Sequence, residues 1–230
     1  MPTTSVALLK AINEIKLEYT IENRTLFSEL GLIVMGKTIE KATKKTLQDA
    51  LFQILTVIGM HDTTFLPKTD KLKIAPGGYT DQVAWGTPFN KLAHILGVPS
   101  GNGGLFSTVS DIITYTQLLL NKGKMPIFFR VFQEDTVEKF LNVTKYRYAN
   151  TRALGWETVP VKDCPCGSKF SPSPDSFGMS DPPSGSFVWT DKKKNVTIVL
   201  LANGAFPGGR GNDPAPVSYT HLTLPTIPLV

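Results

Sequence analysis

The stretch Phe27-Ser-Glu-Leu-Gly-Leu-Ile-Val-Met-Gly-Lys-Thr-Ile-Glu-Lys-Ala-Thr43 decides how this chain folds. Its apolar residues Leu30, Ile33, Val34 and Ile39 lie on or near one face of a helix, because residues three or four apart are neighbours on a helical surface. The pattern predicts a helix from about residue 27 to residue 44 that packs one side against a core.

Helices are also expected on both sides of this stretch. Thr46-Leu-Gln-Asp49 and Thr108-Val-Ser-Asp111 have the form of capping boxes, and Gly59 and Gly123 are natural stops. Residues 67–100 have few periodic runs and are expected to be irregular. Together with the apolar spacing, these signals predict helices over residues 5–15, 27–44, 46–59 and 108–123, and a short one from Thr136.

The character of the sequence changes near its end. Ser186-Phe-Val-Trp-Thr190 and Val196-Thr-Ile-Val-Leu-Leu201 are β-branched and aromatic runs separated by residues 191–195, which is the signal of a β-hairpin. The dense apolar content of the second run predicts a central strand, buried on both faces. Helices followed by sheet strands predict an α+β or α/β domain.

Composition is that of a soluble globular protein, with 41% hydrophobic residues and a formal net charge of +5 over 230 residues. The positive charges are scattered, apart from short runs at Lys41–Lys45, at a helix end, and Lys192–Lys194, in the hairpin turn. A nucleic-acid interface would place them on one face with aromatic residues among them. We therefore predict no nucleic-acid partner.

No residue pattern indicates a metal or a cofactor. Cys164 and Cys166 are separated only by a proline, and two thiols make an incomplete zinc site. His61 and His94 have no ligand-spaced partner, which favours a surface or packing role for each. We predict that the chain binds neither metal nor cofactor.

The sequence leaves the compartment open. N-x-S/T sequons occur at Asn23, Asn142 and Asn195, and these matter only in a secreted or membrane-anchored protein. No apolar stretch is long enough to span a bilayer, so we expect no membrane segment. We also expect that an N-terminal targeting region is not contained in these residues.

The end of the chain differs from the rest. Val217-Ser-Tyr-Thr-His-Leu-Thr-Leu-Pro-Thr226 looks like a translated sequencing adapter. Residues 217–230 are therefore expected to be a non-native tail, and Tyr219 and His221 are excluded from the candidate site. Residues 1–216 then form one partial domain, with helices over about 5–141 and closing strands over about 176–203.

Further segments follow the helix at residues 27–43 in a consistent order. They are Ile58-Gly-Met-His-Asp-Thr-Thr-Phe65, Gly103-Gly-Leu-Phe-Ser-Thr-Val-Ser-Asp111, Ala153-Leu-Gly-Trp156 and Ser176-Phe-Gly178. Together they resemble the serine β-lactamase-related, penicillin-binding-protein-like family, in its class C β-lactamase and esterase branch. The resemblance implies an α+β fold, in which an antiparallel sheet is flanked by helices and joined to a helical region.

The resemblance also implies an acyl-serine chemistry whose residues are not intact here. In the family a serine of a Ser-x-x-Lys motif attacks an ester or lactam carbonyl, a lysine and a tyrosine handle the proton, and a Lys/His-Thr-Gly strand lines the cleft. No Ser-x-x-Lys occurs in these 230 residues, so we expect the nucleophile to lie upstream of Met1.

Two further motifs depart from the family pattern. Phe27 stands at the tyrosine position and Glu29 at the Asn/Asp position, while Met179-Ser180-Asp181 stands where His-Thr-Gly is expected. Phe27 cannot relay a proton, and Asp181 is expected to hinder substrates and repel anionic ones. Ser28, between the first two, has a hydroxyl but no base near it in the sequence. We expect all six positions to line the cleft, with no intact catalytic set.

Two functions remain open. In the first, the chain is a pseudoenzyme domain whose cleft binds a partner or a ligand such as a small ester or amide, or which serves only as a scaffold. The alternative is that it is part of a serine hydrolase of the esterase, β-lactamase or transesterase type. Both interpretations predict that this chain forms no acyl-enzyme. With its first strands missing, the sheet is expected to expose an apolar edge, which predicts poor solubility.

Overall fold

The computed structural model describes residues 5–16, 20, 27–65, 67, 74–77, 84–97, 99–126, 129–142, 152–158, 172–181 and 184–204. Cys164, Cys166, Asn23 and the tail from residue 217 lie outside these ranges. Within them the helices are α1 (Ser5–Glu14), α2 (Glu29–Thr43), α3 (Leu47–Ile58), α4 (Lys91–Leu96), α5 (Val109–Leu120) and α6 (Glu134–Leu141). None of the described helices is long and apolar enough to cross a membrane.

Side-chain caps start the helices where the sequence predicts them. The Thr46 hydroxyl accepts a hydrogen bond from the Asp49 amide at the start of α3, and the Thr108 hydroxyl does the same for Asp111 at the start of α5. Gly59 ends α3 with φ of +81°, a left-handed conformation that costs glycine little. These local signals confirm the predicted start of both helices and the predicted end of α3, whereas α5 ends at Leu120, before the predicted stop at Gly123.

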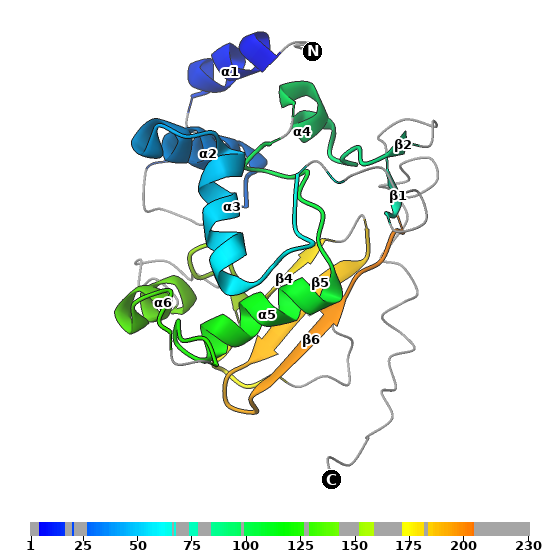
Figure 1. The fold of residues 1–230 in the computed structure, drawn as a ribbon. Coiled ribbons are helices and arrows are strands. Elements are labelled where there is room, and N and C mark those ends of the chain that lie inside the picture. Colours follow the sequence, from blue (N-terminus) through cyan, green and yellow to red (C-terminus); the bar gives the residue numbers. More distant parts are fainter. Residues whose placement is uncertain are drawn as a thin grey trace.

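The main sheet is antiparallel throughout its described part. Its strands are β3 (Glu157–Thr158), β4 (Ser176–Asp181), β5 (Ser186–Asp191) and β6 (Val196–Leu200), in the spatial order β3-β4-β5-β6. A second pair, β1 (Pro76–Gly77) and β2 (Ala84–Trp85), lies apart from it. Figure 1 shows α5 crossing one face of the main sheet, with α2, α3 and α4 beyond it. The predicted hairpin is confirmed as β5 and β6.

Two predictions about this region are wrong. Residues 91–96 form α4 within the stretch expected to be irregular, because the Asn90 side chain caps the helix by accepting from the Ala93 amide. β6 pairs only with β5 in the described sheet and so lies at its edge, with Val196 46% exposed. Apolar content reports what covers the faces of a strand, here α5, and not what pairs with its edges.

Two clusters of buried side chains hold the helices on the sheet. One joins α3 to α5 through Leu55, Ile58 and Leu118, and the other joins α5 and α6 to β4 through Leu119, Val137, Leu141 and Phe177. Trp156 packs edge-on against Phe177, with ring centroids 5.0 Å apart. The core therefore holds the start of β4 at Phe177, and this sets the position of the end of the strand at Asp181.

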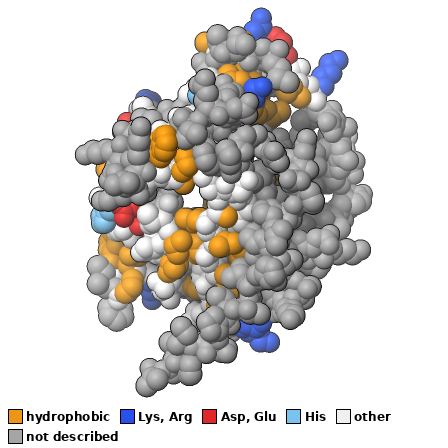
Figure 2. Space-filling view, turned by 90° about the vertical axis from the view of Figure 1, so that its right-hand side faces the viewer, with side chains coloured by type: hydrophobic (Ala, Val, Ile, Leu, Met, Phe, Trp, Pro, Cys, Tyr) orange, Lys and Arg blue, Asp and Glu red, His pale blue; other side chains and the backbone are white. Residues whose placement is uncertain are grey.

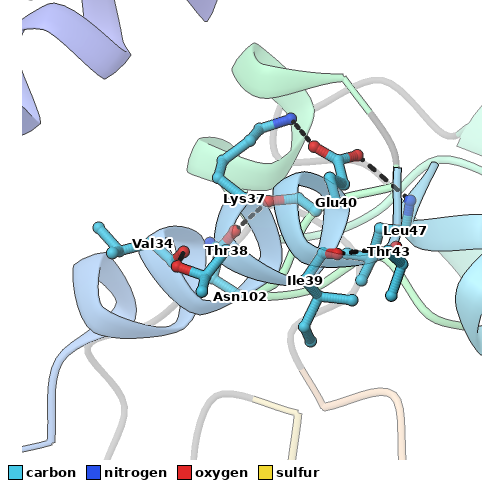
Figure 3. A network of polar contacts seen from close by, with 9 residues as sticks. Val34, Lys37, Thr38, Ile39, Glu40, Thr43, Leu47 and Asn102 are labelled. Atoms are coloured by element: carbon cyan, nitrogen blue, oxygen red, sulfur yellow. Dashed lines mark hydrogen bonds and ion pairs between the residues drawn. The ribbon is translucent and has the colours of Figure 1, made fainter. Parts of the chain in front are cut away.

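A close backbone approach joins α2 to the loop after Ser100. A Cβ at Gly101 would collide with the carbonyl oxygen of Leu32, and one at Gly36 would lie 3.1 Å from the Gly101 Cα. The C-terminal half of α2 is tied to α3 by Glu40, which accepts from Lys37 Nζ at 2.8 Å and from the Leu47 amide at 3.2 Å (Figure 3). The N-terminal half of α2 thereby lies directly against Gly101.

Candidate functional site

A cavity of about 1110 Å³ lies between the start of α2, the segment around α4 and the end of β4. Five of the six predicted cleft positions line it: Phe27, Glu29, Met179, Ser180 and Asp181. The remaining wall comes from residues 75–77, 87–92, 102–106 and 202–203, with Arg152, Glu157 and Ser184. Ser28 is exposed at the start of α2 and is not among the lining residues, and its side chain makes no capping hydrogen bond.

Glu29 is the hub of a hydrogen-bond network in the cavity wall. Asn90 Nδ2 donates to Glu29 Oε1 at 2.9 Å, and Asn102 Nδ2 donates to Oε2 at 3.3 Å. Asn102 Nδ2 also lies 3.0 Å from Asn90 Oδ1, which in turn accepts from the Ala93 amide. The carboxylate thus ties α2, the cap of α4 and the loop after Ser100 together by accepting from the two amides.

Phe27 faces a charged group from the opposite wall. It is 51% exposed, and the guanidinium carbon of Arg152 lies 5.4 Å from the centre of its ring, within the range of a cation–π contact. Arg152 Nη2 also donates to Glu157 Oε1 at 2.8 Å, and the Ser180 hydroxyl donates to Glu157 Oε2 at 3.2 Å. A continuous series of contacts therefore runs from Phe27 to β4.

Asp181 ends β4 and helps to make the turn into β5. Its Oδ2 accepts from the Ser184 amide at 3.2 Å, and its carbonyl accepts from the Gly185 amide at 2.9 Å. The side chain is exposed and lines the cavity. The carboxylate is thus part of the turn, as expected for a short polar residue in this position, and adds a negative charge to the cavity rim.

The described residues hold no group of three or more His, Cys, Asp or Glu side chains that could bind a metal. His61 and His94 are exposed and are not among the residues that line the cavity. On the face drawn in Figure 2, the described lysine and arginine side chains are scattered and form no continuous patch. The absence of a nucleic-acid partner stays a prediction.

The sequence model of the family described as Beta-lactamase matches residues 2–218. The chain belongs to the beta-lactamase family. This confirms the resemblance inferred from the ordered motifs.

Relatives in the beta-lactamase family are similar over most of this chain. A protein of Escherichia coli K12 described as "Putative D-alanyl-D-alanine carboxypeptidase" is 26% identical over 214 residues, which cover 85% of this chain and 48% of the relative. The N-acetylmuramyl-L-alanine amidase of Bacillus subtilis is 24% identical, with the same shares covered. The chain therefore spans about half the length of the curated relatives it matches.

Solved structures agree on the fold. EstCE1, a hydrolase with promiscuous acyltransferase activity, superposes with a TM-score of 0.62 at 17% identity, over 90% of this chain and 59% of that one. A penicillin binding protein of Bacillus halodurans gives a TM-score of 0.62 at 16% identity, over 87% and 57%. The α+β fold of the β-lactamase and transpeptidase type is thus confirmed for this member of the beta-lactamase family.

Four residues that matter in the cavity were not predicted from the sequence: Asn90, Asn102, Arg152 and Glu157. Asn90 and Asn102 lie 61 and 73 residues from Glu29, so no local pattern joins them. Arg152 and Glu157 immediately flank Ala153-Leu-Gly-Trp156, one of the segments used for the resemblance. Their place beside this motif was the signal that could have marked them as cavity residues.

Proposed function

We propose that this chain is a ligand-binding domain of the beta-lactamase family that holds a small ester or amide in the cavity and forms no acyl-enzyme with it. The observation that carries the proposal is Phe27. Its phenyl ring lines the cavity at the position where the family resemblance implies a tyrosine, and the Arg152 guanidinium lies over the ring in a cation–π contact. A ring without an ionisable group cannot take a proton from a serine.

The Ser180 hydroxyl in the cavity wall also lacks the arrangement of an activated nucleophile. Ser180 Oγ donates to Glu157, whose other carboxylate oxygen already accepts from Arg152 at 2.8 Å. A serine becomes a nucleophile when a positioned base removes its proton. Here the carboxylate is engaged in an ion pair, and 230 residues contain no Ser-x-x-Lys to supply another base. These contacts support binding without covalent chemistry.

The test separates binding from acylation. The purified chain is titrated with N-acetylglycinamide by NMR and incubated separately with a fluorophosphonate probe before intact-mass measurement. We expect reversible shifts of cavity resonances and no added mass. The matched variant Phe27→Tyr restores the phenol, and we expect no adduct from it either, because no motif serine is present. A stoichiometric adduct on either protein would refute the proposal.

A second function is favoured by the shares covered in the comparisons. The matched relatives are about twice as long as the matched region, and this chain has a cavity at the motif positions. In this alternative the chain is part of a serine hydrolase that acts through an acyl-serine outside these residues. Sequencing the native transcript beyond both ends tests it. A Ser-x-x-Lys upstream, with acylation of the longer protein, would establish the hydrolase, and a longer open reading frame without that serine would exclude it.

A further inference from the structure

Two donors converge on the carboxylate of Glu157 from different parts of the cavity wall. Arg152 Nη2 donates to Oε1 at 2.8 Å, and Ser180 Oγ donates to Oε2 at 3.2 Å. The side chains of Arg152 and Glu157 are 28% and 15% exposed. A guanidinium and a hydroxyl that bind the two oxygens of one carboxylate form a recognition site for that group. In this chain the carboxylate bound there is the side chain of Glu157.

The backbone segments that carry the two donors are held by contacts that do not involve the Glu157 side chain. Arg152 and Glu157 form an antiparallel backbone bridge, and the Ala153 amide donates to the Trp156 carbonyl at 2.9 Å, which closes the turn between them. Ser180 lies within β4, where it pairs with Phe187 of β5. Removal of the Glu157 carboxylate is therefore expected to leave both donors facing the cavity.

We propose that Arg152 and Ser180 form a carboxylate subsite of the cavity, that Glu157 fills this subsite in the ligand-free chain, and that a ligand carboxylate binds by displacing it. The inference rests on the proposed ligand-binding function. A tethered carboxylate competes at high effective concentration, so it weakens the binding of carboxylate ligands and has little effect on neutral ones. Glu157 is thus an internal competitor that makes the cavity select against anions.

The test compares a carboxylate probe with its neutral amide. N-acetylglycine and N-acetylglycinamide are titrated into the wild-type chain, Glu157→Ala and the double variant Glu157→Ala/Arg152→Met by isothermal titration calorimetry. We expect Glu157→Ala to bind N-acetylglycine at least about tenfold more tightly than the wild type, or about 1.4 kcal/mol. We expect the amide to bind both alike, and the double variant to lose the gain. A gain that survives without Arg152 would overturn the subsite.

Further variants separate this subsite from general charge effects. Glu138→Ala removes an exposed carboxylate of α6 that pairs with Lys122 outside the cavity, and we expect no change in the affinity for either probe. Asp181→Ala removes another carboxylate of the same cavity, and we expect a gain below about threefold from reduced repulsion through solvent. A gain equal to that of Glu157→Ala would show that any negative charge suffices and would contradict the proposal.

Two outcomes distinguish this inference from the proposed function. If the neutral amide binds every variant and N-acetylglycine gains nothing from Glu157→Ala, the subsite is refuted while binding in the cavity stands. If neither probe binds any variant, both proposals fail. Glu157→Gln keeps the shape of the side chain and removes its charge. If Glu157→Ala does not fold, the same comparison is made with Glu157→Gln, for which we expect a gain of at least about threefold.

Discussion

Replacing Asp191 by asparagine is expected to destabilise the chain by about 2.5 kcal/mol at pH 7. Asp191 ends β5 and is 1% exposed. Burial alone would raise the pKa of its carboxyl, but hydrogen bonds from the Ser173 hydroxyl at 2.6 Å, the Ser173 amide at 2.9 Å and the Lys194 amide at 2.9 Å lower the pKa to about 2. An asparagine would turn an NH₂ group toward at least one of these donors.

The magnitude follows from the difference between the pKa of the Asp191 carboxyl in the unfolded chain and its pKa in the folded chain. The ordinary aspartate pKa of 3.8 applies to the unfolded chain, and the folded value is about 2. Because the folded pKa is the lower one, the stabilisation is complete above about pH 4 and disappears as the pH falls toward 2. For a domain of this size, 2.5 kcal/mol corresponds to a melting temperature about 5–10 °C lower.

The assay is urea unfolding followed by tryptophan fluorescence at pH 7 and at pH 2, for the wild type and Asp191→Asn. We expect the difference in the free energy of unfolding to be near its full value at pH 7 and to shrink markedly at pH 2. Asp175→Asn is the matched control, because Asp175 is exposed just before β4, and its effect is expected to stay within about 0.5 kcal/mol. Equal stability of wild type and Asp191→Asn at pH 7, or a difference that persists undiminished at pH 2, would refute the reasoning.

Three further predictions concern the cavity wall, the contact between Gly101 and α2, and the sheet edge. Glu29→Ala removes the Glu29 acceptor of the Asn90 amide and leaves the Asn102 amide only its bond to Asn90, so we expect a loss of about 1–2 kcal/mol in urea unfolding and a smaller loss for Glu29→Gln; equal losses would contradict this. Gly101→Ala is expected to cost about 3 kcal/mol, because the new Cβ meets backbone atoms of α2 that have no room to move, and a near-normal melting curve would count against that contact. Val196→Lys is expected to reduce self-association in sedimentation velocity, because a charge on an edge strand disfavours edge pairing; unchanged association would place the contact elsewhere.

Much of the fold was predictable because its signals are local. The caps at Thr46 and Thr108 lie within three residues of the amides they accept from, and the β5–β6 hairpin is joined by a short polar turn. The family was also readable from ordered motifs, which the match over residues 2–218 confirms. By contrast, α4 was missed because its cap at Asn90 is not followed by an apolar repeat long enough to be read as a helix.

The candidate site was likewise predictable in part: the sequence indicated the motif positions but not their partners. The motif positions Phe27, Glu29, Met179, Ser180 and Asp181 were placed at the cleft by resemblance, and the structure brings all five to one cavity. Their partners could not be predicted, because the partners depend on contacts between segments far apart in the chain. The amides that donate to the Glu29 carboxylate come from residues 61 and 73 positions away.

The sequence by itself determined the helices, the closing hairpin, the family and the absence of a Ser-x-x-Lys from these residues. Those features depend on neighbours in the chain or on the order of short motifs. Only the tertiary structure decided that β6 lies at the edge of the described sheet, and that Arg152 and Ser180 both bind the Glu157 carboxylate. Side-chain recognition requires donors and acceptors to meet within about 3 Å, and that distance is set by packing between elements rather than by the residues of any one of them.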